Sequence, residues 1–288
     1  MFNFAEKGHK KPWYTYPNLF DLLKQTEYHT VWLSNQPPVS QHGNTDKIFS
    51  ARTDEAAFIE YTGGTITGDN DNETAHNYDS KLLPVLDQFL TNHENVYAKR
   101  IYFIHTMGAH YAYRNRYPTK EFEKFSADDE PPSKPSWQKT QAEYDNAVLY
   151  SDYILDEIIK RFESKNAVVI YVSDHGMEVY DEGRNHNGHS AENQGIRGMI
   201  EVPMFIWVSQ AFQRDNRELV QRIRAAKDKP FRTDNMIHLL LDILDIHSTS
   251  YKPQKSLINA SYDSSPLRLY NGKPYYKSER KQKSYKEQ

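Results

Sequence analysis

A short run of β-branched and aromatic residues, "AVVIYVSD" at positions 167–174, most constrains what this chain can fold into. A run without polar residues at alternate positions is typical of a strand that is buried on both faces of a sheet. Such a sheet needs a layer of helices on each side. Apolar residues at helical intervals precede the run at 138–164, and a second apolar run, "EVPMFIWVS", follows at 201–209.

The rest of the chain alternates in the same way. Further strands are expected at 29–35 and 99–108, helices are expected at 18–26, 78–92, 210–226 and about 232–245, and the stretch 48–61 is ambiguous. The alternation predicts an α/β fold with a mostly parallel sheet flanked by helices on both faces. We expect one α/β domain over residues 1–250 and a polar, basic extension over residues 251–288. The extension either touches an anionic membrane surface or is a solvated terminus.

Composition excludes several classes of protein. The net charge of −3 gives no reason to expect a nucleic-acid partner. The absence of cysteine rules out disulfides, thiolate metal sites and a cysteine nucleophile. No apolar run reaches the roughly 18 residues of a membrane span, and the N-terminus lacks the apolar core of a signal peptide. The chain by itself is therefore predicted to be soluble.

Polar residues follow three of the predicted strands. They are Ser34 to Gln36, His105 to His110, and Asp174 with His175. Ligands of open α/β sheets gather beyond the carboxyl ends of the strands, so these residues are expected to converge at one edge.

Asp174 and His175 suit a divalent cation such as Zn²⁺ or Mn²⁺. Gly176 would let the chain turn so that both side chains address one ion, which would polarise a phosphoryl or sulfuryl oxygen. The alternative is a polar turn in which the aspartate only caps the chain.

Four further histidines lie near the predicted strand ends: His105, His110, His186 and His189. Those in "HTMGAH" are either a core and a surface histidine or residues of the same site. Those in "NHNGHS" are either loop histidines or groups that donate hydrogen bonds to a phosphate and protonate a leaving group.

The segment "SDHGMEVYDEGRNHNGHS", followed by "EVPMFIWVS", resembles the metal-binding signature of the phosphoethanolamine transferases. These are sulfatase-like members of the alkaline phosphatase superfamily. Three other segments resemble the same family in the same order: "KPWYTYPNLFDLLKQTEYHTVWLSNQ", "FIHTMGAHYAYRNRYP" and "YDNAVLYSDYILDEII". Four separated motifs in order are more specific than any one of them. The Tyr-Asp and Gly-His pairs favour the branch that acts on core sugars of lipopolysaccharide over the branch that acts on lipid A.

The resemblance implies an alkaline phosphatase/sulfatase-like fold and assigns site residues. Asp174 and His175 become metal ligands, with zinc as the expected ion. His110 and His189 become the residues that hold the transferred phosphate or a second metal. His189 fits better than His186 because it lies in a Gly-His-Ser sequence like that of the family. The implied donor is phosphatidylethanolamine, and the implied acceptor is a lipopolysaccharide core sugar or lipid A.

The family attacks its donor with a threonine, and an acidic metal ligand lies further upstream on the first strand. Residues 1–10 contain no threonine, and Glu6 is not on a predicted strand. The resemblance therefore implies an N-terminally truncated domain, the C-terminal part of a longer enzyme. In that enzyme transmembrane spans come first, and the domain lies at the periplasmic face of the inner membrane. The chain alone is expected to be inactive, unless Thr62, Thr65 or Thr67 in the glycine-rich loop replaces the nucleophile.

Two alternatives remain open. One is a sulfatase-like hydrolase or phosphodiesterase, although the chain has no cysteine for the Cys-x-Pro-x-Arg form of the sulfatase motif. The other is a catalytically inert domain with an incomplete metal site.

Overall fold

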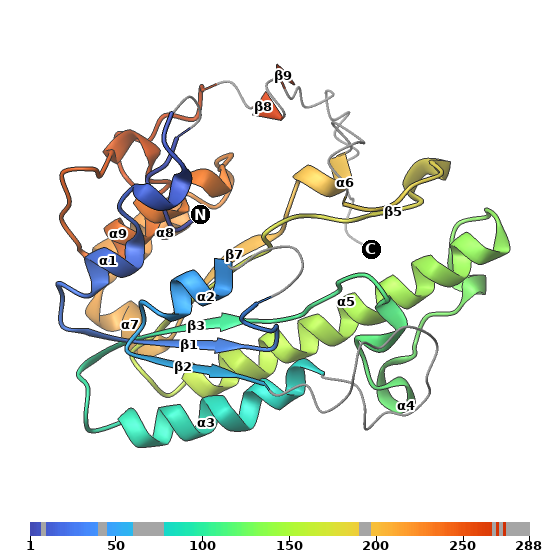
Figure 1. The fold of residues 1–288 in the computed structure, drawn as a ribbon, viewed down its shortest axis with the longest axis horizontal. Coiled ribbons are helices and arrows are strands. Elements are labelled where there is room, and N and C mark those ends of the chain that lie inside the picture. The colour runs from blue at the N-terminus through green and yellow to red at the C-terminus, as the bar shows by residue number, and fades with distance from the viewer. Residues whose placement is uncertain are drawn as a thin grey trace.

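A three-stranded parallel sheet forms the centre of the fold (Figure 1). In the computed structural model, the structure describes residues 1–6, 10–39, 45–59, 78–189, 197–266, 269–270 and 273–274. The strands are β1 (Tyr28–Ser34), β2 (Glu55–Phe58) and β3 (Lys99–His105), in the order β2-β1-β3. Ser34 is in register with His105, so β1 and β3 end at the same edge of the sheet.

The apolar run at 167–174 forms β4 (Val168–Val172). The strand expected at 201–209 forms β7 (Met204–Val208), which pairs with β4. The two strands run antiparallel. The parallel arrangement is therefore confirmed for β1, β2 and β3. Two short antiparallel pairs complete the described strands: β5 (Glu178–Val179) with β6 (Asn187–Gly188), and β8 (Leu269–Tyr270) with β9 (Lys273–Pro274).

Two long helices cover one face of the central sheet. They are α3 (Leu82–His93) and α5 (Pro135–Phe162). Proline suits the first position of α5, where its missing N–H has no intrahelical acceptor. Leu33 of β1 packs with Leu86 of α3 and Ile154 of α5 in one core cluster, and all three are fully buried.

The other face is covered by α1 (Leu19–Leu23) and α9 (Met236–Leu244). Leu23 and Ile237 pack there against the half-buried Ile101 and Phe103 of β3. Helices on both faces confirm the predicted α/β fold. No helix among the described residues is long and apolar enough to cross a membrane.

The remaining helices are short. They are α2 (Thr45–Ser50), α4 (Thr119–Phe122), α6 (Arg197–Ile200), α7 (Gln210–Asp215) and α8 (Arg217–Ala225). The stretch that was ambiguous from sequence holds the end of α2 and all of β2. The single helix expected at 210–226 breaks at Asn216, whose φ of −127° and ψ of 47° lie outside the helical region.

The segment after residue 250 begins with buried residues. Leu257 and Ile258 pack against Met236 and Leu239 of α9. The division of the chain at residue 250 stays a prediction, and most of the basic tail lies outside the described residues.

A cleft of about 2170 Å³ runs between the central sheet of β1, β2 and β3 and the pair of β4 and β7. Its walls include Ile101 to His105 of β3 and Val168 to Val172 of β4. No ladder of hydrogen bonds joins these two strands in the described part of the chain. The predicted site residues lie at the carboxyl end of both walls.

Candidate active site

Four residues predicted from the sequence lie together beyond β3 and β4. The His175 Nε2 atom is 3.8 Å from Asp174 Oδ2. The rings of His175 and His189 stack with centroids 4.0 Å apart and planes 17° apart. The His110 ring lies with its centroid 5.9 Å from that of His189. The geometry therefore brings the four residues to one place, while their roles stay a prediction.

The backbone selects the tautomer of His175. Its Nδ1 atom is 3.0 Å from the carbonyl oxygen of Gly176, which can only accept a hydrogen bond. Nδ1 therefore carries the proton, and Nε2 presents its lone pair on the side of Asp174. A ligating histidine is held in this way in most metal sites. The Asp174 side chain is 71% exposed and open to a ligand, so the pair fits a divalent ion.

Gly176 is needed for packing rather than for an unusual turn. A Cβ atom at this position would lie 2.0 Å from the carbonyl oxygen of Gly198. The Gly176 N–H donates to the carbonyl of Met199 at 3.1 Å. Gly176 does not have a positive φ. The bend at Asp174 and His175 therefore needs no backbone conformation that only glycine adopts, and the missing side chain of Gly176 lets α6 approach the residues that follow β4.

The segment after β3 is held by a buried carboxylate. Asp79 accepts hydrogen bonds from the backbone N–H groups of Met107 and Gly108, both at 2.8 Å, and from the side chain of Asn35 at 2.7 Å. Gly108 has a φ of 58°, which a glycine adopts without strain. This clamp fixes the path of the chain from His105 to His110.

The two histidines of this segment have different surroundings. His105 Nδ1 lies 3.1 Å from the hydroxyl of Ser34 and 3.4 Å from a carboxylate oxygen of Asp46. Burial lowers the pKa of His110, and the Arg116 guanidinium and the His189 ring act in the same direction. A neutral His110 can donate one hydrogen bond to an oxyanion.

Asp46 is a residue of this region that was not predicted from the sequence. It lies in the first turn of α2, at the edge where β1 ends. Burial raises the pKa of the Asp46 carboxyl, His105 partly offsets this shift, and Asp174 adds to it. The only signal in the sequence was an acidic residue soon after a predicted strand, which is too common to single out.

His186 has different contacts from His189. Its carbonyl accepts a hydrogen bond from the Tyr180 N–H at 2.8 Å, and its own N–H donates to the carbonyl of Arg184. The ring that stacks on His175 belongs to His189, and the preference for His189 as a phosphate-binding residue stays a prediction. The loop with Thr62, Thr65 and Thr67 lies outside the described residues.

Comparison with known proteins identifies the family. A profile described as Sulfatase matches residues 2–246. The chain belongs to the sulfatase family. Within it, the chain is 27% identical to the phosphoethanolamine transferase EptC of Escherichia coli (strain K12) over 281 residues. It is 28% identical to the phosphoethanolamine transferase CptA of Salmonella typhimurium over the same length.

These alignments cover 96% of this chain but 46% of each relative. The chain thus spans about half the length of the curated relatives it matches. The crystal structure of the C-terminal periplasmic domain of EcEptC from Escherichia coli, in complex with Zn, superposes with a TM-score of 0.78 at 26% identity. The superposition covers 96% of this chain and 74% of that domain. The alkaline phosphatase/sulfatase-like fold is therefore confirmed, as is the resemblance to phosphoethanolamine transferases.

Proposed function

We propose that this chain forms the metal- and phosphate-binding part of an enzyme that moves phosphoethanolamine from phosphatidylethanolamine to lipopolysaccharide. The observation that carries the proposal is the stacked pair of His175 and His189, with Asp174 and His110 beside it. Similarity to EptC and CptA supports this reaction over sulfate ester hydrolysis.

Asp174 and the Nε2 atom of His175 would hold a divalent ion, with zinc as the best candidate. Bound there, the ion would polarise a phosphoryl oxygen and offset the negative charge that develops on it. The relative solved with zinc supports this choice of metal.

His110 and His189 would bind the phosphate that is transferred. His189 stacks on His175 and His110 lies next to His189, so a phosphoryl group near the ion would be within reach of their ring N–H groups. A neutral His110 would donate a hydrogen bond to a phosphate oxygen without adding a charge. His189, on the edge of the site, would in addition protonate the leaving oxygen.

The transfer would take place in two steps. A threonine oxygen would form a bond to the phosphorus while the bond to diacylglycerol breaks, and the proton of the threonine would pass to a base. The acceptor oxygen would then form the new bond to phosphorus and release the threonine. We place this threonine in the half of the relatives' length that the chain does not span. The 288-residue chain alone would therefore not catalyse the transfer.

The acceptor would be a core sugar or lipid A, with the core sugar favoured by the Tyr180-Asp181 and Gly188-His189 pairs. The reaction would occur at the periplasmic face of the inner membrane. This placement follows the periplasmic domain named in the structural relative.

The test measures release of diacylglycerol and transfer of phosphoethanolamine from a fluorescent phosphatidylethanolamine analogue. It compares the 288-residue chain with a protein extended to the relatives' full length. Activity is expected in the extended protein, reduced at least about 100-fold by His175→Ala and by His189→Ala. His247→Ala, at an exposed position, is the control and should leave activity unchanged. Full activity of the His175→Ala variant would refute the proposed site.

A further inference from the structure

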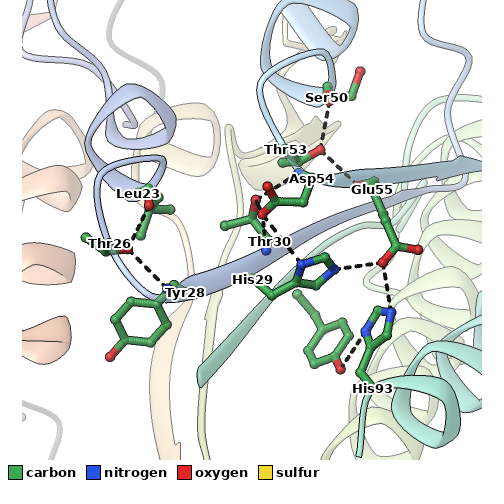
Figure 2. Close-up of polar contacts among 11 residues, drawn as sticks. Leu23, Thr26, Tyr28, His29, Thr30, Ser50, Thr53, Asp54, Glu55 and His93 are labelled. Atoms are coloured by element: carbon green, nitrogen blue, oxygen red, sulfur yellow. Dashed lines mark hydrogen bonds and ion pairs between the residues drawn. The ribbon is translucent and has the colours of Figure 1, made fainter. Parts of the chain in front are cut away.

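A second group of residues that could bind a metal lies at the amino-terminal ends of the central strands, opposite the end that carries the candidate active site. It consists of His29 at the start of β1, Glu55 at the start of β2 and His93 at the end of α3 (Figure 2). One ligand atom from each residue lies within 4.8 Å of the other two. We propose that this group binds a divalent transition-metal ion, zinc in the first place, at a site distinct from the candidate active site.

The two sites are separated by the length of the strands. β1 pairs with β3 from Tyr28 and Lys99 at one end to Ser34 and His105 at the other. At a rise of about 3.3 Å per residue, His29 lies about 17 Å from the edge where His105 ends its strand. One ion cannot serve both places.

The donor atoms converge on one point. Glu55 Oε1 lies 2.7 Å from His29 Nε2 and 2.9 Å from His93 Nε2. Ligand atoms around a tetrahedral zinc ion, at about 2.0–2.1 Å from the metal, are about 3.3 Å apart. To reach this spacing, the Glu55 oxygen would move about half an ångström away from each nitrogen, and the two imidazole nitrogens, which lie within 4.8 Å of each other, would close on the ion. Two imidazoles and one carboxylate are a common ligand set of zinc sites that keep an open position.

The surroundings of the two histidines suit metal binding. His29 Nδ1 lies 3.8 Å from Asp54 Oδ2, and His93 Nδ1 lies 3.4 Å from the Tyr102 hydroxyl. With Nε2 bound to metal, each Nδ1 carries a proton and faces an acceptor. Asp54 is itself held, because Oδ2 accepts from the backbone and the hydroxyl of Thr30, both at 2.7 Å.

Burial holds the ligands and leaves one path for the ion. The side chains of His29 and His93 are 10% and 6% exposed, whereas that of Glu55 is 40% exposed. Tyr97 stacks on His29 with ring centroids 3.6 Å apart, which restricts rotation of that imidazole. An ion would enter past Glu55 and keep a water molecule on the exposed side. It would tie α3 to the two strands, which assigns it a structural role.

The experiment uses the 288-residue chain with Asp174→Ala and His175→Ala, which removes the ligands of the candidate active site. Zn²⁺ is titrated by calorimetry, and Co²⁺ is followed by its visible d–d absorption. One equivalent of either ion should bind, and zinc should raise Tm. Adding His93→Ala or the shape-preserving Glu55→Gln should weaken zinc binding about 100-fold, and Asp54→Asn about 10-fold.

His247→Ala is the matched control, because His247 is exposed and should not affect binding. Circular dichroism in the absence of metal checks that each variant is folded. Failure of the chain to bind zinc, or binding that Glu55→Gln and His93→Ala leave unchanged, would overturn the proposal. A loss of stability in Glu55→Gln without any zinc binding in the parent would identify the group as a hydrogen-bond network and would also overturn it.

Discussion

The carboxylate of Asp79 accepts a hydrogen bond from the backbone N–H of Gly108 at 2.8 Å, which ties the turn after β3 to the residues that start α3. The same carboxylate binds the N–H of Met107 and the amide of Asn35, at the end of β1. One buried side chain thus joins two strand ends and the helix that covers them. The position of His110 depends on this clamp.

Asp79→Ala should lower the free energy of unfolding by about 3 kcal/mol, because one buried and two partly buried hydrogen-bond donors lose their acceptor. Asp79→Asn keeps one acceptor oxygen and should cost less. Urea denaturation measures both. Asp87→Asn on the following helix α3 is the control, since its partially exposed ion pair with Arg161 should contribute at most about 1 kcal/mol. Equal losses in Asp79→Ala and Asp87→Asn would contradict the clamp.

Gly176→Ala should destabilise the protein by about 1–3 kcal/mol, because the new methyl group would overlap the carbonyl oxygen of Gly198. The displacement should also move His175, the preceding residue. Urea denaturation gives the first effect, and the NMR shift of the His175 ring gives the second. Gly183→Ala is the comparison: its Cβ enters open space but its φ of 75° disfavours a side chain. The Gly183 variant should leave the His175 signal in place.

The stability of the protein should fall as the pH is lowered through the range in which His238 would take up a proton. Burial lowers the pKa of His238 to about 4, and Lys255 adds to the effect. His238 is 3% exposed. The unfolded chain, with a histidine pKa of about 6.5, binds the proton more readily. The stabilisation that comes from the neutral His238 is therefore complete above about pH 6.5 and is lost as the pH falls to about 4. The loss in the free energy of unfolding amounts to about 3 kcal/mol.

His238→Gln removes the titration and leaves an acceptor for the Lys252 N–H, which His238 Nδ1 accepts at 3.2 Å. The variant should lose less stability than the parent between pH 6.5 and 4 in urea denaturation. His247→Gln, at an exposed position, should follow the parent. Parallel pH curves for the parent and His238→Gln would be inconsistent with a buried neutral imidazole.

Zinc should bind only weakly at Asp174 and His175 in the 288-residue chain. Two ligands are fewer than the three protein ligands typical of catalytic zinc. Calorimetry in a His93→Ala background, which removes the second proposed site, isolates this pair. Asp174→Ala should then abolish the remaining heat. Tight binding in that background would mean that a further residue, with Asp46 the first to test, completes the site.

The α/β layers, the strands β1, β3, β4 and β7, and the convergence of the four candidate residues could be predicted from the sequence. Apolar runs and helical spacing report burial locally, so β4 and α5 were found within a few residues. Polar residues at strand ends pointed to one edge of the sheet, since parallel strands end together, and His105 and Ser34 are in register there.

What the sequence could not decide depends on contacts between segments far apart in the chain. β7 runs antiparallel to β4 because the path of the chain between them sets its direction, and no periodic pattern encodes that direction. The requirement for glycine at 176 comes from the backbone of Gly198. His29, Glu55 and His93 meet only because strand register places β2 beside β1 and packing places the end of α3 against both. Side-chain burial and polar motifs at strand ends leave a local trace in a sequence, whereas the convergence of single polar groups without such a motif, as in this group, arises only from the tertiary fold.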